Sequence, residues 1–183
     1  MREPNKIVLT GGPGIGKTTL LNELKNQGYT IIPEAARMII EEEQQRDTLC
    51  LPWKDIYAFQ KKTADRILEL EHSFSDSLIL CDRGLTDGHA YASEGRVPTP
   101  EIIIEEAIGR YEKVFILDQL STYQTDDSRK ESKEKATRMH RNIHKAYLDF
   151  GYNPLRVPAF KGTLEETVRK RADFITNLIG SLK

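Results

Sequence analysis

An eight-residue stretch near the amino terminus constrains this chain more than any other feature. It reads Gly11-Gly12-Pro13-Gly14-Ile15-Gly16-Lys17-Thr18, and it stands between the apolar run 6–10 and the amphipathic segment 17–27. The apolar run predicts a buried strand, and the amphipathic segment predicts a helix that ends at Gly28. Glycines let the backbone between them wrap closely around a ligand, and the free N–H groups of a helix start point the same way. The stretch therefore predicts a cradle for phosphate groups.

The pattern G-x-x-x-x-G-K-[ST] also assigns side-chain roles within this cradle. Lys17 is expected to reach the β- and γ-phosphates of a nucleoside triphosphate, and Thr18 to hold Mg²⁺ through its hydroxyl. Thr19 lies one residue further into the helix and is expected to make a lesser nucleotide contact. The expected cofactors are therefore ATP and Mg²⁺, held by residues 11–19.

Short apolar runs alternate with helical patterns along the rest of the chain. Strands are predicted at 6–10, 29–32, 77–81, 113–117 and 154–157, and helices at 17–27, 34–46, 53–74, 87–93 and 100–110, from a polar stretch at 118–132 to about 150, and at 163–180. The helix 53–74 is expected to place Trp53, Ile56 and Tyr57 on its apolar face, with one polar break at Gln60. Strands that are continuously apolar are buried on both faces, which predicts an α/β fold with a parallel sheet covered by helices on both sides. No linker divides the 183 residues, so a single domain is expected over 1–183.

Charge and cysteine content exclude several classes of protein. The chain has 27 Lys and Arg against 28 Asp and Glu, which is not the composition of a general polyanion binder. Two cysteines, Cys50 and Cys81, do not make a disulfide framework, and no run approaches the ~18 apolar residues of a membrane span. We therefore expect a reduced cytoplasmic protein with no membrane partner and no nucleic acid partner.

The end of the third predicted strand carries Asp82 and Arg83. A carboxylate at this edge of a parallel sheet can hold Mg²⁺ through its water shell. Many motor ATPases have a second carboxylate at the next position, which polarises an attacking water, whereas here Arg83 offers a fork for a phosphate or an anionic acceptor. The alternative is that Asp82 and Arg83 form a salt bridge with each other at the strand end.

The end of the second predicted strand carries Glu34, with Arg37 one helical turn further on. Glu34 is a candidate base for the proton of an acceptor hydroxyl, and Arg37 could hold a negative group of the acceptor. The alternative is that Glu34 is an acidic residue favoured by the helix dipole. The run Glu41–Glu43 is expected to be a solvated face. Neither an Asp-x-x-Gly motif after Asp82 nor an Asn-Lys-x-Asp motif is present, so a switch-type GTPase is disfavoured.

Positive charge gathers in the segment 129–145, which holds seven Lys or Arg and two Glu. A mobile lid is predicted at about 118–140, with Arg129, Arg138 and Arg141 as candidates to stabilise charge on the transferred phosphoryl group. The alternative is a solvated helix with pairs such as Glu134–Arg138. His140 and His144 are four residues apart and are expected to be surface histidines. Charged residues near the carboxyl terminus, Lys161 and Arg169–Arg171, are likewise expected at the surface.

The runs IVLTGGPGIGKTTL, PEAAR, CDRGLTDGHAY and GYNPLRVP together resemble the P-loop kinase-like "AAA domain" ATPases, which are related to nucleotide kinases and to the ribosylnicotinamide-kinase domain. The resemblance extends from about residue 6 to 175. It implies a P-loop NTPase fold, a three-layer αβα sandwich whose five strands run in the order 2-3-1-4-5. It implies that Asp82 and Arg83 lie near Mg²⁺ and the acceptor, and that Glu34, Arg37, Asp87 and Tyr91 face the acceptor pocket. It also puts Arg129 at the place of a lid arginine and Pro158–Gly162, including Phe160, where related kinases pass the adenine ring.

Three functions remain open from the sequence. The first is a small-molecule kinase that moves the γ-phosphoryl group of ATP to a nucleoside-like or other small acceptor, with Lys17, Glu34, Asp82, Arg83, Arg129 and Arg138 as catalytic residues. The second is a regulatory nucleotide-binding ATPase without a small-molecule acceptor. The third is a nucleic-acid processing ATPase, which the lack of stacking aromatics in the basic segment disfavours.

Overall fold

The computed structural model describes residues 4–46, 49–119 and 133–180. Its strands are β1 (Asn5–Thr10), β2 (Thr30–Ile32), β3 (Leu78–Asp82), β4 (Lys113–Leu117) and β5 (Leu155–Val157). Its helices are α1 (Lys17–Asn26), α2 (Ala35–Arg46), α3 (Ile56–Ser73), α4 (Leu85–Glu94), α5 (Glu101–Glu106), α6 (Lys133–Asp149) and α7 (Leu164–Gly180). The strands form one parallel sheet in the order β2-β3-β1-β4-β5, which confirms the predicted fold.

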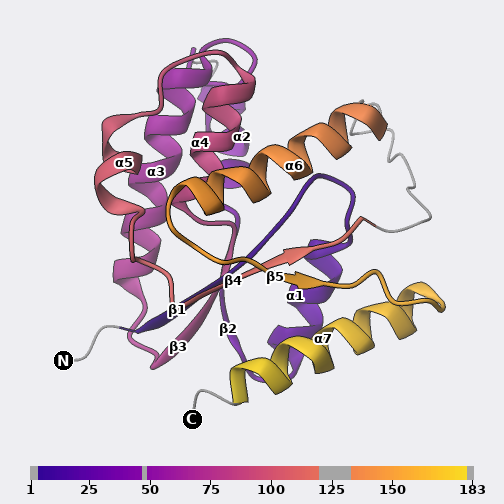
Figure 1. Cartoon of the computed structure of the whole chain (residues 1–183). Coiled ribbons are helices and arrows are strands. Elements are labelled where there is room, and N and C mark those ends of the chain that lie inside the picture. Colours follow the sequence, from indigo (N-terminus) through magenta and orange to yellow (C-terminus); the bar gives the residue numbers. More distant parts are fainter. Residues whose placement is uncertain (1–3, 47–48, 120–132, 181–183) are drawn as a thin grey trace.

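Helices cover both faces of the sheet and make three layers (Figure 1). Alternate residues of β1 show why, because Ile7 and Leu9 pack with α1 and α7, whereas Val8 packs with α4 and α6 on the other face. Side chains on a strand alternate between faces, so a strand that is apolar at every position needs a cover on each side. The predicted sandwich follows from this requirement.

Parallel pairing brings the functional loops to one edge of the sheet. Leu9 of β1 lies opposite Asp82 of β3, and the backbone N–H of Arg83 donates to the Leu9 carbonyl at 3.1 Å. The loop that follows β1 and the turn that follows β3 are therefore neighbours. Ligands bind at this edge in open α/β sheets, at the carboxyl ends of the strands.

Two helix starts differ from their predicted positions for reasons of capping. The helix predicted from Trp53 begins at Ile56, because the side chain of Asp55 accepts the Ala58 N–H at 2.9 Å and caps the helix there. Trp53 is 62% exposed and lies before the helix, so its predicted place on the apolar face is wrong. The helix predicted from Asp87 begins earlier, at Leu85, with Gly84 as its N-cap.

Two charged residues predicted at the surface are buried. Arg171 is 1% exposed, because its guanidinium donates to three backbone carbonyls that give it polar partners in the interior. Glu43 is 2% exposed and forms an ion pair with Lys62 of α3, so the run Glu41–Glu43 is not a uniformly solvated face. A buried charge needs a partner of this kind.

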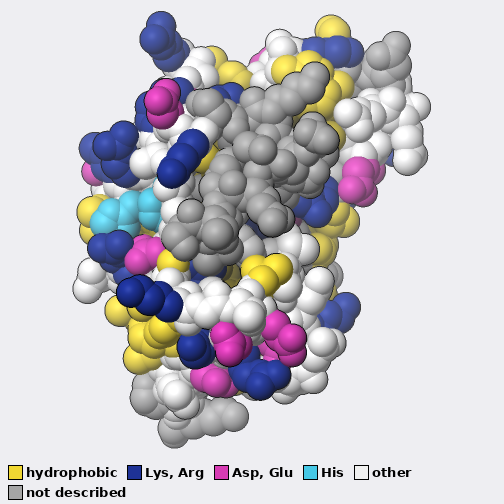
Figure 2. Space-filling model, turned by 90° about the vertical axis from the view of Figure 1, so that its right-hand side faces the viewer, with side chains coloured by type: hydrophobic (Ala, Val, Ile, Leu, Met, Phe, Trp, Pro, Cys, Tyr) yellow, Lys and Arg dark blue, Asp and Glu magenta, His cyan; other side chains and the backbone are white. Residues whose placement is uncertain are grey.

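Charged residues of both signs are interspersed over the described surface that faces the viewer in Figure 2. On this face, Lys and Arg side chains do not form one continuous positive field of the kind that binds a nucleic acid backbone. Cys50 and Cys81 are both free thiols. Among the helices of the described ranges, none has the length and apolar character that a bilayer span requires.

Candidate active site

The loop between β1 and α1 depends on glycine at positions with left-handed backbone. Gly11 has φ +140°, and a side chain there would put its Cβ 2.6 Å from Cδ1 of Ile15. Gly16 has φ +78° and directly precedes the first residue of α1, Lys17. Other residues adopt such φ values only with strain. The glycines therefore permit the tight loop that the sequence predicts for phosphate binding.

Lys17 is buried at the base of this loop and contacts two carboxylates. Its ammonium group forms an ion pair with Asp82, and Glu34 Oε2 lies 3.9 Å away. Burial lowers the pKa of Lys17 and Arg83 lowers it further, whereas Glu34 and Asp87 act in the opposite direction. A triphosphate in the loop would supply further negative charge for this ammonium group.

Glu34 and Arg83 form the central ion pair of the site. Arg83 Nε donates to Glu34 Oε1 at 3.0 Å, and Arg83 Nη1 donates to the Gly11 carbonyl at 3.1 Å. Burial alone would raise the pKa of Glu34, but Arg83, Lys17 and Arg37 together lower it to about 2. Glu34 is therefore ionised and able to accept a proton or a hydrogen bond. Asp82 pairs with Lys17 and Arg83 pairs with Glu34, so the predicted alternative of a salt bridge between Asp82 and Arg83 is wrong.

Asp87 holds Arg83 in place from the other side. Its Oδ1 accepts hydrogen bonds from Thr10 Oγ1 at 2.5 Å and from Arg83 Nη1 at 2.8 Å. Its Oδ2 accepts from the Gly84 N–H at 3.1 Å and from the Tyr147 hydroxyl at 2.7 Å. With four donors on one buried carboxylate, Asp87 serves to fix its neighbours.

Tyr91 packs against the same guanidinium. The Arg83 carbon Cζ lies 5.6 Å from the centroid of the Tyr91 ring, within the range of a cation–π contact. Arg83 is thus held by two carboxylates, one carbonyl and one ring. Asp87 and Tyr91 both border the cavity described next.

Two hollows meet at Glu34 and Arg83. A cleft of about 980 Å³ runs along residues 12–19 and the outer face of α2, past Arg37, Glu41 and Gln44, to Trp53. A separate cavity of about 180 Å³ lies between α2, α3 and α4. Glu34, Arg83 and Tyr91 line both hollows. A molecule in the cavity would therefore present one end to the phosphate loop.

The cavity is largely apolar, and α3 contributes two polar side chains to its lining that the sequence did not assign to the site, Gln60 and Thr63. Its apolar wall is formed by α2, α3 and α4 together with α5, and includes Ile40, Ile56, Phe59, Ala64, Ile67, Leu85 and Ile103. Gln60 of α3 lies among them and is 4% exposed. The polar break at Gln60 on the apolar face of the predicted helix was the signal that could have identified it.

Helix α6 lies directly against the phosphate loop. The Gly12 N–H donates to His140 Nδ1 at 3.3 Å, and a Cβ on Gly12 would lie 2.9 Å from the Ala136 carbonyl. His140 is therefore half-buried against the loop, and its prediction as a surface residue is wrong. Burial lowers the pKa of His140, which favours the neutral ring that accepts this hydrogen bond.

The predicted lid arginines have three different outcomes. Arg138 donates to Glu94 of α4 at 2.6 Å, whereas the sequence predicted Glu134 as its ion-pair partner. Arg138 lines neither the cleft nor the cavity. Arg141 is exposed. Arg129 lies outside the described residues, as does most of the predicted lid. Lys135, also on α6, does border the large cleft.

Arg171 anchors the segment Pro158–Gly162, which is predicted to lie beside the adenine ring. The Arg171 guanidinium donates to the carbonyls of Pro158 at 3.0 Å, Ile15 at 2.7 Å and Asp118 at 2.6 Å. The Phe160 ring lies against Phe174 of α7, with centroids 6.1 Å apart. Arg171 thus ties the phosphate loop to the ends of β4 and β5.

Thr18 and Asp82 are compatible with Mg²⁺ by the chemistry of their donor atoms. Both offer hard oxygen ligands, Thr18 is exposed on the large cleft, and Asp82 borders the cavity next to it. Magnesium in nucleotide sites takes few protein ligands, because phosphate oxygens and water supply the others. Over residues 4–46, 49–119 and 133–180, no group of three His, Cys, Asp or Glu side chains is placed to hold a metal ion.

Several solved structures share this fold. The NadR protein in complex with NR superposes with a TM-score of 0.64 at 14% identity, covering 94% of this chain and 52% of that chain. A deoxyadenosine kinase from M. mycoides, with the products dCMP and dCDP bound, has a TM-score of 0.64 at 18% identity and covers 97% of this chain and 100% of that chain. The NadR protein with NAD and AMP-PNP has a TM-score of 0.59 at 14% identity, covering 94% and 49%. The chain thus spans about half the length of NadR.

These TM-scores show that the chain shares its fold with NadR and with the deoxyadenosine kinase. No curated protein matches the sequence at a significant level. The sequence model of the AAA domain family matches residues 6–167, which is most of the chain and includes the phosphate loop, Glu34, Asp82 and Arg83. The chain therefore belongs to the AAA domain family.

Proposed function

We propose that this protein is a small-molecule kinase that transfers the γ-phosphoryl group of ATP to a hydroxyl of a nucleoside-like acceptor. One observation carries the proposal. Glu34 and Arg83 stand where the phosphate cleft meets the apolar cavity, and they line both. A carboxylate and a guanidinium at such a junction are suited to a reaction between two bound molecules.

Each group at the junction has a part in the proposed transfer. The acceptor oxygen attacks the γ-phosphorus, the bond from this phosphorus to the β,γ-bridging oxygen breaks, and ADP leaves. The hydroxyl proton passes to the carboxylate of Glu34, whose low pKa suits a transition state that needs little deprotonation of the nucleophile. Arg83 and Lys17 offer positive charge beside the transferred group. Mg²⁺, held by Thr18 and Asp82, would neutralise phosphate charge when bound.

The cavity supports an acceptor with one flat ring. Its volume of about 180 Å³ is close to that of a protein cavity of about 150 Å³ that binds benzene. Gln60 can both donate and accept a hydrogen bond, so it can pair with a ring edge that carries an acceptor beside a donor. A pyrimidine or pyridine nucleoside has this character and a hydroxymethyl group to present at Glu34.

The large cleft gives the acceptor or the nucleotide further polar contacts. Arg37 of α2 borders it beside the phosphate loop and can hold a negative group. Trp53 borders the same cleft at its outer end and is the single tryptophan of the chain. Its fluorescence therefore reports on occupation of this cleft.

The test is to incubate the protein with γ-labelled ATP and Mg²⁺ and a panel of pyrimidine, pyridine and purine nucleosides. Label should appear on a single-ring nucleoside. Substituting Glu34→Gln should lower kcat by about a hundredfold or more. Glu41→Gln is the matched control, because Glu41 borders the same cleft from α2, the helix that begins directly after Glu34, and its effect should stay within about twofold.

Gln60→Leu should raise the KM of the nucleoside about tenfold and leave the KM of ATP unchanged, because it removes hydrogen bonds to the ring only. Label that appears only as free phosphate, at a rate that no nucleoside changes, would favour a regulatory nucleotide-binding ATPase instead.

A further inference from the structure

Arg83 has a backbone conformation that its own side chain does not favour. Its φ is +72°, in the left-handed region, although it carries a full side chain. A residue other than glycine stays in this region only where its surroundings hold it there. The contacts with Glu34, Gly11 and Asp87 fix the guanidinium from the cleft side. The backbone of the turn is fixed from the opposite side.

Tyr111, just before β4, supports the turn from behind. Its hydroxyl accepts the N–H of Leu85, the first residue of α4, at 2.8 Å. Its ring contacts the preceding residue closely, because a Cβ on Gly84 would lie 2.8 Å from two carbons of the ring. Tyr111 is 4% exposed, so its hydroxyl lies in the interior, where a polar group needs a partner. The turn between Asp82 and Leu85 is therefore held by Tyr111, through Gly84 and Leu85, and by Asp87, through Arg83 and Gly84.

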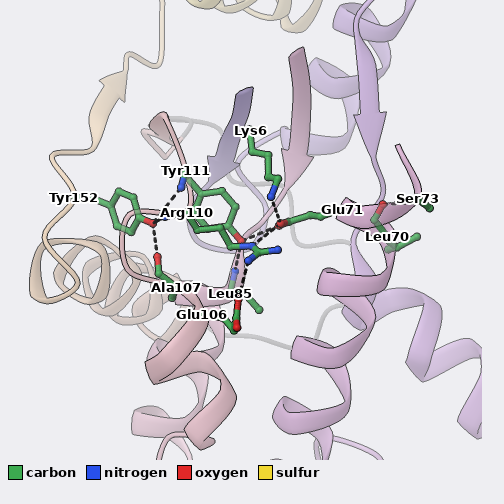
Figure 3. Close-up of polar contacts among 10 residues, drawn as sticks. All are labelled: Lys6, Leu70, Glu71, Ser73, Leu85, Glu106, Ala107, Arg110, Tyr111 and Tyr152. Carbon is green, nitrogen blue, oxygen red and sulfur yellow. Dashed lines mark hydrogen bonds and ion pairs between the residues drawn. The ribbon is translucent and has the colours of Figure 1, made fainter. Parts of the chain in front are cut away.

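The direction of the Tyr111 hydroxyl is set by Glu71 of α3 (Figure 3). The hydroxyl donates its proton to Glu71 Oε1 at 3.0 Å, which leaves a lone pair for the Leu85 N–H. Glu71 Oε2 also forms ion pairs with Lys6, at 3.3 Å, and with Arg110, at 2.6 Å. Burial raises the pKa of Tyr111 far above its usual value, and Glu71 raises it further, so the hydroxyl keeps this proton. Within this network, Lys6, Glu71, Arg110 and Tyr111 border neither hollow, whereas Leu85 borders the cavity.

We propose that Tyr111, oriented by Glu71, is a positioning residue for Arg83. Tyr111 contacts the Leu85 N–H and Gly84 and so fixes the backbone of the turn, in which Arg83 has its left-handed conformation. This conformation directs the Arg83 guanidinium towards Glu34. The inference rests on the proposed function only where it concerns catalysis, since the position of Arg83 can be measured on its own.

The first test is the exchange rate of the Arg83 Nε–H, followed by ¹⁵N NMR in wild type, in Tyr111→Phe and in Tyr152→Phe. Tyr152 is the matched control, because its hydroxyl contacts Arg110, Tyr111 and Ala107 but no residue of the turn. Tyr111→Phe should raise the exchange rate about tenfold, and Tyr152→Phe should leave it unchanged within about twofold. An unchanged rate in Tyr111→Phe overturns the proposal.

Catalysis gives the second test. Tyr111→Phe should lower kcat about tenfold with the KM of ATP unchanged, and it should have no further effect in an Arg83→Lys background. Additive effects in this double-mutant cycle overturn the proposal. If wild type transfers no phosphoryl group while Tyr111→Phe still loosens Arg83, the kinase function fails and the positioning role stands. Should Tyr111→Phe not fold, Glu71→Gln takes its place in the NMR experiment, with at least a threefold faster exchange expected and an unchanged rate overturning the proposal.

Discussion

The backbone N–H of Gly12 donates a hydrogen bond to Nδ1 of His140 across 3.3 Å, and this contact joins the phosphate loop to α6. The contact requires a neutral imidazole, since a protonated ring has no lone pair to accept with. Three charged or titratable groups act on the ring, Asp118, His144 and Arg156. The geometry of the loop is thereby linked to pH and to the placement of α6.

Replacing His140 should weaken nucleotide binding in a way that depends on the replacement. His140→Ala removes the acceptor and should raise the Kd for ATP up to about tenfold at pH 8. His140→Asn keeps an acceptor at a similar place and should recover most of this loss. Because burial lowers the pKa of His140 from its ordinary value of 6.5, the ring of the folded protein stays neutral below pH 6.5, and the contribution is lost only as pH falls through the lowered pKa. Trp53 fluorescence titrations at pH 8 and pH 5 check this, and equal Kd values for His140→Ala and wild type at pH 8 would contradict it.

Arg171 should contribute far more to stability than Arg169, the exposed arginine of the same helix. Arg171→Ala leaves the carbonyls of Ile15, Asp118 and Pro158 without their donor, at a cost of about 3 kcal/mol or more in the free energy of unfolding. Arg169→Ala is the control, because its side chain is 70% exposed and pairs only with Glu165. Its effect should stay within about 0.5 kcal/mol. Urea unfolding curves of the three proteins measure the difference.

Glu34 should make the stability of the folded protein depend on pH in the acid range. Its pKa is lowered from 4.5 to about 2 in the folded state, so its ion pairs stabilise the fold above pH 4.5. That stabilisation, on the order of 2 kcal/mol, is lost as pH falls from 4.5 towards 2. Glu34→Gln should therefore be less stable than wild type at pH 7 and converge with it near pH 2. Thermal unfolding across this range would refute the prediction if the two curves ran parallel.

Arg138 should matter little to phosphoryl transfer. Its partner Glu94 holds it on the surface of α6 and α4, and its side chain is 52% exposed. Arg138→Ala should change kcat by less than about twofold and stability by less than about 1 kcal/mol. Arg129→Ala, in the predicted lid, should lower kcat at least about tenfold if that segment supplies the charge. Steady-state kinetics of both variants decide between the two arginines.

The layout of the fold follows from local patterns that the sequence displays directly. Ile7, Val8 and Leu9 are consecutive apolar residues, which predicts a strand covered on both faces. Helices do cover both faces of β1. Gly11 and Gly16 have the positive φ that the loop pattern requires. These features depend on residues close together in the chain, so a single sequence is enough to predict them.

Contacts over long sequence separations could not be predicted in the same way. Asp87 borders the cavity as expected, but its four hydrogen-bond donors, from Thr10, Arg83, Gly84 and Tyr147, could not be predicted. Arg171 resembles its exposed neighbours in the sequence, and only the fold brings it to the carbonyl of Ile15. The spacing of apolar residues predicts which face of a helix is buried. It does not predict which polar side chain will have a hydrogen-bond partner in the interior.

The strand order has a consequence for synthesis of the chain. β1 is made first but lies in the middle of the sheet, between β3 and β4. Its first partner begins at Leu78 and its second ends at Leu117, so the frame of the phosphate loop is incomplete until well over half of the chain has left the ribosome. At about 5–20 residues per second, β1 waits several seconds without its neighbours. The buried apolar residues of β1, Ile7, Val8 and Leu9, thus stay without their neighbours until then, and an exposed strand of this kind is a site at which a nascent chain can aggregate or be bound by a chaperone.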